Sequence, residues 1–149
     1  MASLKVSIQT DMKAALRESD KPRLSTIRML LAAIQRREID ERIELDDGSV
    51  LQVIEKLVKQ GAESAKQFAA GGRDDLVAKE KAEIEILKAY LPEPLSDTEL
   101  DTLIDAAMQS TGASSIKDMG KVMSAIRKQA QGRVDMGAVS GRVKAKLAG

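Results

Sequence analysis

The sequence predicts an all-α fold. Its 149 residues include one Tyr, one Phe and no Trp, so Leu, Ile, Val, Ala and Met must supply the core. The strong helix formers among these outnumber the β-branched residues, and the apolar positions recur at intervals of three and four. With 43% hydrophobic residues, the chain can form one domain of ordinary size or two small ones.

Two helices are expected ahead of an aspartate turn at residues 46–48. The first apolar pattern stops at residues 19–22, where Pro22 interrupts it before a second pattern begins. The second pattern lasts until the aspartate turn, whose side chains can also cap the helix that follows. The stripes are Leu4, Ile8, Met12, Ala15 and Leu16 in the first helix, and Leu24, Ile27, Leu30, Leu31, Ile34 and Ile39 in the second.

Two further helices are expected before a pair of prolines. The third helix ends at Gly71 and Gly72, which suit a helix C-terminus. Gly61 lies in its middle, where glycine costs about 1 kcal/mol relative to alanine. A weak point or a close contact between helices is favoured there over a functional hinge. The fourth helix ends at Pro92 and Pro94, because neither proline can continue the helical hydrogen-bond ladder.

A second unit is expected to begin after these prolines. Residues 96–99 have the capping-box pattern, in which a serine and a glutamate satisfy backbone N–H groups at a helix start. Three short helices follow, and Gly112 and Gly132 end the first two. Their lengths suit a small bundle that relies on the preceding helices for stability. We therefore expect an N-terminal four-helix unit, residues 1–93, and a C-terminal three-helix bundle, residues 94–149.

The sequence contains no histidine and no cysteine. It therefore lacks the usual base at neutral pH, the commonest metal ligand, thiolate chemistry and disulfides. We expect no metal and no cofactor. No apolar run approaches the ~20 residues of a transmembrane helix, and the first sixteen residues carry charges within a helical pattern, unlike a signal peptide. A cytoplasmic location without membrane association is the expectation.

A row of lysines lies on one side of the helix expected over residues 116–130. On a helical wheel, Lys117, Lys121 and Lys128 fall within a narrow arc opposite the apolar stripe. From Lys117 onward the chain has eight basic residues and two acidic ones, a local charge of +6 in a chain of formal charge +1. Such a patch attracts phosphate backbones, although a solvated helix face is the commoner explanation. Without aromatic residues there, RNA contacts would be mainly to shape and backbone.

Two carboxylates, Glu80 and Glu83, lie in the apolar sector of the fourth helix. Acids so placed could act as a general acid and a general base with raised pKa values. No nucleophile motif, metal-binding cluster or phosphate loop accompanies them, so a structural role is favoured. Arg28 is the expected ion-pair partner of one of them, because a buried carboxylate is tolerated mainly when it is paired.

Three motifs resemble the GatB/YqeY family, and specifically its stand-alone YqeY-like members. They are the run from Tyr90 to Pro92, residues 118–123, and the turn from Gly132 to Asp135. The start of the second helix and the Glu83-Ile84 step of the fourth resemble that family as well. The resemblance covers essentially the whole chain.

The resemblance implies an all-helical protein whose C-terminal part is similar to the tail of GatB, a subunit of glutamine-dependent tRNA amidotransferase. Because that tail helps to hold tRNA, the leading hypothesis is a non-catalytic tRNA-binding or tRNA-metabolism accessory module. A family label would read carbon–nitrogen ligase with glutamine as amido-N-donor, but that chemistry belongs to large domains for which 149 residues leave no room. The RNA-binding candidates are Lys117, Lys121, Lys128, Arg133, Arg142 and Lys144.

Two other functions stay open. The chain could be a helper subunit that docks on an amidotransferase or an aminoacyl-tRNA synthetase through its N-terminal helices. An exposed apolar patch around Met12 or Met29 would favour that function. The chain could also be an enzyme that uses Glu80 and Glu83, which requires both carboxylates to line an open pocket. Burial of the pair against Arg28 would exclude the enzyme.

Overall fold

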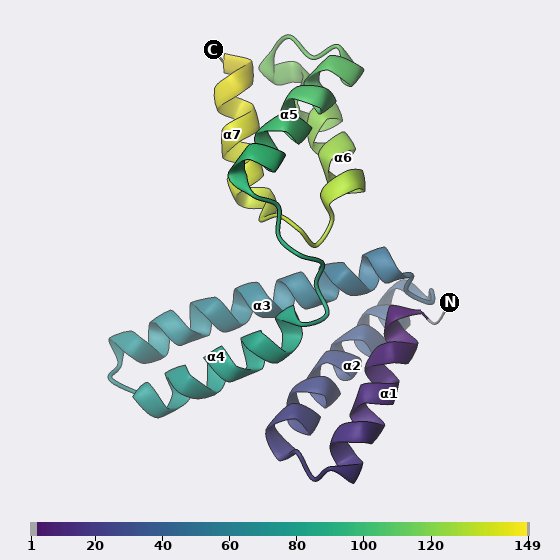
Figure 1. The fold of residues 1–149 in the computed structure, drawn as a ribbon, viewed down its shortest axis with the longest axis vertical. Coiled ribbons are helices and arrows are strands. Elements are labelled where there is room, and N and C mark those ends of the chain that lie inside the picture. Colours follow the sequence, from purple (N-terminus) through teal and green to yellow (C-terminus); the bar gives the residue numbers. More distant parts are fainter. Residues whose placement is uncertain (1–2, 149) are drawn as a thin grey trace. The chain divides into compact units, whose positions relative to one another are not determined.

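A computed structural model describes residues 3–148, and its regular elements are helical (Figure 1). Over this range there are seven α-helices, one short 3-10 helix and no strand, so the all-α prediction is confirmed. The chain divides into two compact units, one ending at Leu91 and the other beginning at Pro92. The division lies close to the boundary expected after residue 93. Over the range described, no helix is both long and apolar enough to cross a membrane.

The N-terminal unit contains two helical hairpins. Its helices are α1 (Leu4–Arg17), α2 (Lys21–Glu41), α3 (Asp47–Ala70) and α4 (Asp74–Lys88). In Figure 1, α1 and α2 lie side by side, and so do α3 and α4. Helix α2 connects the hairpins, because it packs against α3 and α4 as well as α1.

Short polar side chains fix where these helices begin. Pro22 lies in the first turn of α2, where its missing N–H removes no helical hydrogen bond. A side-chain oxygen caps the start of three helices and thereby satisfies an N–H group that the helix itself leaves unpaired. The capping bonds run from the N–H groups of Val6, Arg23 and Ser49 to the side chains of Ser3, Asp20 and Asp46.

Aliphatic side chains from all four helices form the N-terminal core. Burying each large one contributes about 1.5–3 kcal/mol, so this packing supplies most of the stabilisation. Two polar contacts between distant segments support it: Lys5 Nζ lies 2.8 Å from Glu38 Oε1, and the Tyr90 hydroxyl donates to Asp11 Oδ2 at 2.6 Å. The buried core residues are Ile8, Ile27, Leu30, Ile34, Leu45, Val50, Val53, Ile54 and Leu87.

Gly61 marks a close contact between α3 and α4. Helix α3 continues through it without interruption, so glycine does not break the helix here. A Cβ atom added at Gly61 would lie 3.1 Å from Ile84 Cγ1 and 3.5 Å from Glu80 Oε2. The close-contact interpretation therefore applies, since even a Cβ atom would require the Ile84 side chain to shift by a few tenths of an ångström.

The C-terminal unit packs three α-helices around a second aliphatic core. They are α5 (Asp97–Thr111), α6 (Met119–Ala130) and α7 (Met136–Ala148), and the 3-10 helix η1 (Ile116–Asp118) precedes α6. The predicted capping box is confirmed at the start of α5, where Ser96 and Glu99 bond to each other's backbone N–H groups. Buried residues of this core are Leu100, Ile104, Ala107, Val122, Ile126, Ala130, Val139, Val143 and Leu147.

The helix expected over residues 116–130 differs from the structure in its first turn. Residues 116–118 form η1, and the α-helix begins only at Met119. The Asp118 carboxylate explains this, because it accepts hydrogen bonds from the backbone N–H groups of Ser114 and Ser115 at 3.0 and 3.4 Å. A side chain that bonds back to its own backbone competes with a regular α-helical turn.

The contact at Gly61 can be tested by comparing adjacent positions on α3. Gly61→Leu should destabilise the protein by about 1–2 kcal/mol, because overpacking against Ile84 outweighs the gain in helix propensity. Ala62→Leu, on the exposed side of the same turn, should change stability by no more than about 0.5 kcal/mol. Urea unfolding followed by circular dichroism measures both changes. Equal effects at the two positions would show that the α3–α4 contact does not constrain residue 61.

Candidate nucleic-acid interface

A shallow groove of about 610 Å³ runs along the exposed face of α6. Its lining residues recur every four positions, which places them on one face of the helix. Three of them are small, and a Cβ atom at Gly120 would meet no other atom within 4 Å, so a ligand's backbone can approach closely. The groove is lined by Thr111 at the end of α5 and by Gly120, Lys121, Ser124, Ala125, Lys128 and Gln129 on α6.

Lys121 and Lys128 give this groove its charge. Both are exposed, and neither forms an ion pair or a side-chain hydrogen bond with any residue between 3 and 148. They stand seven residues apart, which corresponds to about 10 Å along the helix axis. Asp118 lies close enough that the Lys121 charge helps to lower its pKa, after the larger effect of the Ser114 and Ser115 N–H groups. The two ammonium groups are therefore available to a ligand.

Lys117 and Lys144 are exposed but do not line the groove. Lys117 lies on η1, so the helical wheel that aligned it with the α6 lysines does not describe its position. Lys144 projects from α7. Neither forms an ion pair among the residues that the structure describes, so each adds positive charge to the unit outside the groove.

Arg133 connects the chain entering α5 to the turn between α6 and α7. Its Nε donates to the carbonyl of Glu93 at 2.7 Å, and its own carbonyl accepts the N–H of Leu95 at 2.9 Å. Hydrogen bonds from Ser96, together with the Arg133 charge, lower the pKa of Glu99. Part of the Arg133 side chain is thus committed to holding the unit together.

The carboxylates of α5 neutralise one side of α7. Arg142 pairs with Asp101 and lies 3.5 Å from Asp97 Oδ1, while Lys146 Nζ lies 2.7 Å from Asp105 Oδ1. The local charge of +6 counted from Lys117 omitted these acids, which precede it in the chain. Aspartates at every fourth position of α5 were the signal that sequence analysis missed. Because these aspartates neutralise α7, the basic face of the unit is that of α6. Arg142 joins α7 to α5 through its ion pairs.

Glu80 and Glu83 line a small hollow in the N-terminal unit. It has a volume of about 190 Å³, and Gly61 and Ser64 of α3 form part of its wall. Burial raises the pKa of Glu83, and the neighbouring Glu80 charge raises it further. Arg28 is exposed, and no ion pair joins it to either carboxylate over residues 3–148, so the expected pairing is not observed. Across that range no cluster of three or more His, Cys, Asp or Glu residues could hold a metal ion.

The sequence matches a family of known proteins over nearly its whole length. A family model described as "Yqey-like protein" matches residues 5–147. The chain belongs to this family. The resemblance noted from the Tyr90, Asp118 and Gly132 motifs is therefore confirmed.

Curated relatives of this YqeY-like protein carry the name "Altered inheritance of mitochondria protein 41, mitochondrial". The protein from Pyrenophora tritici-repentis is 32% identical over 128 residues, covering 83% of this chain and 71% of the relative. The one from Eremothecium gossypii is 41% identical over 85 residues, or 56% of this chain and 46% of the relative. The one from Lachancea thermotolerans is 34% identical over 122 residues, covering 77% of this chain. The matches thus span from 46% to 71% of these relatives' lengths.

These names contradict the cytoplasmic location expected from the sequence. The relatives are named as mitochondrial proteins, so that expectation is wrong. It depended on the lack of a signal-peptide core and of a transmembrane run. Neither feature distinguishes the cytoplasm from other compartments whose proteins also lack them.

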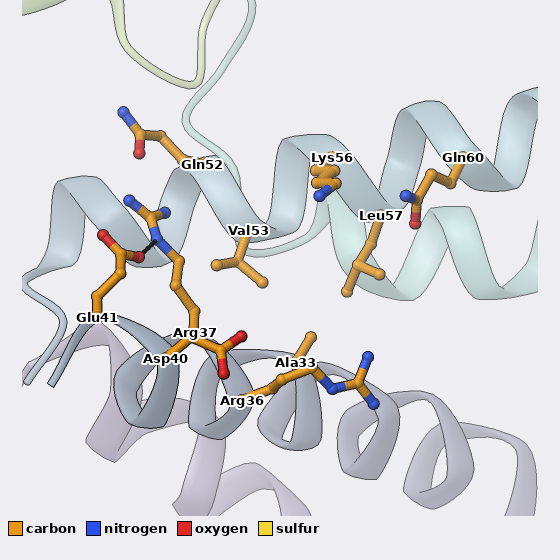
Figure 2. Close-up of a pocket in the computed structure, with 10 residues that line it drawn as sticks. All are labelled: Ala33, Arg36, Arg37, Asp40, Glu41, Gln52, Val53, Lys56, Leu57 and Gln60. Carbon is orange, nitrogen blue, oxygen red and sulfur yellow. Dashed lines mark hydrogen bonds and ion pairs between the residues drawn. The ribbon is translucent and has the colours of Figure 1, made fainter.

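The N-terminal unit of this YqeY-like protein has a second groove, between α2 and α3 (Figure 2). Its volume is about 550 Å³. Val53 and Leu57 of α3 point toward α2 and supply apolar surface, and charged and amide side chains surround them (Figure 2). The full lining is Ala33, Arg36, Arg37, Asp40 and Glu41 of α2 with Gln52, Val53, Lys56, Leu57 and Gln60 of α3.

Exposed apolar side chains in this unit lie mainly away from the predicted patch. Met12 packs against the core, and Met29 is 39% exposed. Among the large hydrophobic residues that the structure describes in this unit, the largest exposures are those of Ile39 at 67%, Leu16 at 56% and Ile43 at 51%. The end of α2 is therefore more apolar on its surface than the positions that sequence analysis singled out.

The raised pKa of Glu83 predicts a pH-dependent effect on stability. The folded state binds the Glu83 proton more tightly than the unfolded chain does. The stability that this proton contributes is therefore greatest below the ordinary pKa near 4.5, and it is lost as the pH rises through the pKa of Glu83 in the folded state. Glu83→Gln mimics the protonated form. It should raise Tm by roughly 1–2 °C at about pH 7, a small gain because solvent screens this partly exposed group.

Thermal unfolding at several pH values measures this effect. The gain should disappear at about pH 4 and below, where the wild-type carboxyl is already protonated. Glu85→Gln, an exposed carboxylate on the same helix, is the control and should leave Tm nearly unchanged. A gain from Glu83→Gln that is the same at both pH values would contradict the assignment to proton binding.

Proposed function

We propose that this YqeY-like protein is a non-catalytic tRNA-binding or tRNA-metabolism accessory module. In this proposal the N-terminal four-helix unit, residues 1–93, and the C-terminal three-helix bundle, residues 94–149, have separate roles, and the C-terminal bundle contacts the RNA. The observation that carries the proposal is the α6 groove, in which neither Lys121 nor Lys128 forms an ion pair with any residue between 3 and 148.

The chemistry of the groove favours contact with phosphates rather than bases. Ammonium groups bind phosphate oxygens and release counterions from the nucleic acid. Phe68 and Tyr90, the chain's two aromatic residues, precede Pro92, so this unit offers no ring on which a base could stack. Ser124 and Gln129 supply further hydrogen-bonding groups beside the lysines. Such a surface recognises the shape and backbone of a folded RNA.

The other basic candidates contribute unequally in this proposal. Lys117 and Lys144 extend the positive charge, because neither is neutralised among the described residues. Arg133 can offer only the part of its guanidinium that does not bond to Glu93. Arg142 acts indirectly, since its ion pairs with Asp97 and Asp101 position α7.

A helper subunit is the second candidate function. The groove between α2 and α3 and the exposed Ile39 favour it, because they offer apolar surface within a polar rim. The partner would be an amidotransferase or an aminoacyl-tRNA synthetase. Enzymatic use of Glu80 and Glu83 is disfavoured, since their hollow of about 190 Å³ is smaller than the roughly 300–1,000 Å³ of typical small-molecule sites. Ligase activity forms no part of the proposal.

The RNA proposal is tested by reversing the charge of the groove. The variant Lys121→Glu with Lys128→Glu should abolish binding to a total tRNA pool, because it places two negative charges against the phosphates. For the wild type, binding should weaken with salt and resist competition by an RNA duplex of similar length. Losing two phosphate contacts should reduce the slope of log K against log salt by about two in any residual binding. Filter binding or fluorescence anisotropy at two salt concentrations measures these changes.

The matched control carries the same charge reversal in the other unit. Lys59 and Lys66 are exposed lysines on α3 with the same seven-residue spacing. Lys59→Glu with Lys66→Glu should leave tRNA affinity within about two-fold of the wild type, since these positions lie outside the groove. Equal losses from both double variants would attribute binding to net charge and remove the α6 groove as the site. Unchanged tRNA binding by the Lys121→Glu with Lys128→Glu variant would also exclude the α6 groove as the RNA-binding site.

A further inference from the structure

Ile39 projects from α2 beside a hollow that lies on the same helix. Its side chain is 67% exposed, more than any other large hydrophobic residue over the described range. The hollow next to it has a volume of about 250 Å³. The lining residues are Ala32, Gln35, Arg36, Ile39 and Asp40.

The spacing of these lining residues has a geometric meaning. Residues at i, i+3, i+4 and i+7 of a helix surround a hole that accepts one side chain from a facing helix. Ala32, Gln35, Arg36 and Ile39 have this spacing. Helix α2 therefore presents a protruding apolar side chain and a hole of the kind that receives one, within the same two turns. A surface with both features is complementary to a second copy of itself.

The charges beside Ile39 are also complementary to a second copy. Arg36 and Asp40 are both exposed, and neither forms an ion pair or a side-chain hydrogen bond over residues 3–148. In Figure 2 a dashed line joins Arg37 to Glu41, and none reaches Arg36 or Asp40. An arginine four residues before an acid is the weaker order for pairing within one helix. Both charges therefore remain available across an interface.

We infer that the C-terminal half of α2 is a self-association surface, on which two copies of the chain pack antiparallel about a two-fold axis. In such a pair, Ile39 fits the hole of the partner when the axis crosses α2 near Arg37. Arg36 meets the partner's Asp40 when the axis crosses near Glu38. The two requirements agree to within about one residue, or ~1.5 Å along the helix, so one arrangement satisfies the apolar and the charged contacts together.

The resulting dimer is weak. Its contact is a short stretch of one helix against its copy, and interfaces at the small end of the range bind transiently. Ile43, which is 51% exposed and lies two residues after the end of α2, adds apolar surface at the end of the stretch. This inference goes beyond the proposed RNA function, since it concerns the N-terminal unit and needs no RNA.

Sedimentation velocity of the full chain tests the inference. Between about 1 µM and about 1 mM, the weight-average mass should rise from 16.1 kDa toward twice that value. Ile39→Asp should hold the protein at the monomer mass, because it places a charge in the hole of the partner. Leu16→Asp, at a similarly exposed position on α1, should dimerise as the wild type does. A wild-type chain that stays monomeric, or a loss of dimer in the control alone, would overturn the inference.

The two-fold pairing of charges has its own test. Arg36→Asp and Asp40→Arg should each raise the dimer Kd about ten-fold or more, since like charges then face each other. The double variant Arg36→Asp with Asp40→Arg should restore wild-type dimerisation. An equimolar mixture of the two single variants should form a heterodimer, because one is acidic and the other basic at the same two positions. Circular dichroism confirms that each variant is folded. If neither single variant differs from the wild type, the antiparallel arrangement is wrong.

Discussion

Burial of aliphatic side chains is the interaction on which both units depend. With a single phenylalanine and a single tyrosine in the chain, each core is filled by leucine, isoleucine, valine and alanine, and these pack well only where helices approach closely. The contact of Gly61 with Ile84 shows how closely the helices approach, because a Cβ atom at residue 61 would lie only 3.1 Å from Ile84 Cγ1. Close packing of this kind leaves the opposite helix faces free to carry charge.

The distribution of charge in the C-terminal unit follows from how its helices pair. Asp97, Asp101 and Asp105 recur every four residues on α5 and meet cations of α7. Such exposed pairs add little stability individually, about 0–1 kcal/mol each. Their larger effect is that Arg142 and Lys146, which they neutralise, are less available to bind a ligand. The positive charge that remains is concentrated on η1 and α6, along with Lys144.

Features that depend on neighbouring residues can be predicted from the sequence better than features that depend on distant ones. The helices, the capping box of Ser96 and Glu99 and the end of α2 before Asp46 follow from local rules of spacing and capping. The α6 groove is partly predictable, because Lys121 and Lys128 lie on the same side of a helical wheel. Its other wall is Thr111, the last residue of α5, and a wheel drawn for α6 alone does not reveal that residue. The spacing of the α5 aspartates places them on one face of that helix, but it does not show that Arg142, 41 residues from Asp101, lies opposite that face.

The expected pairing of Arg28 with Glu80 or Glu83 failed for the same reason. A helical wheel identifies which residues share a face but not which face of another helix lies opposite. Glu80 and Glu83 turned out to face α3, where Gly61 leaves a hollow, and Arg28 is exposed on α2. Burial and the Glu80 charge raise the pKa of Glu83, and together they outweigh the opposing effect of the Lys79 charge.

The two surfaces proposed for this protein depend on different forces and should respond differently to salt. Binding of phosphates by Lys121 and Lys128 releases counterions, so added salt opposes it directly. The contact at Ile39 is apolar, and salt does not weaken burial of hydrocarbon; only the flanking pair of Arg36 and Asp40 is screened. Because both charges of that pair lie at the protein surface, the loss is small. Raising the salt concentration therefore separates the two activities within one intact chain, and no variant is needed to distinguish them.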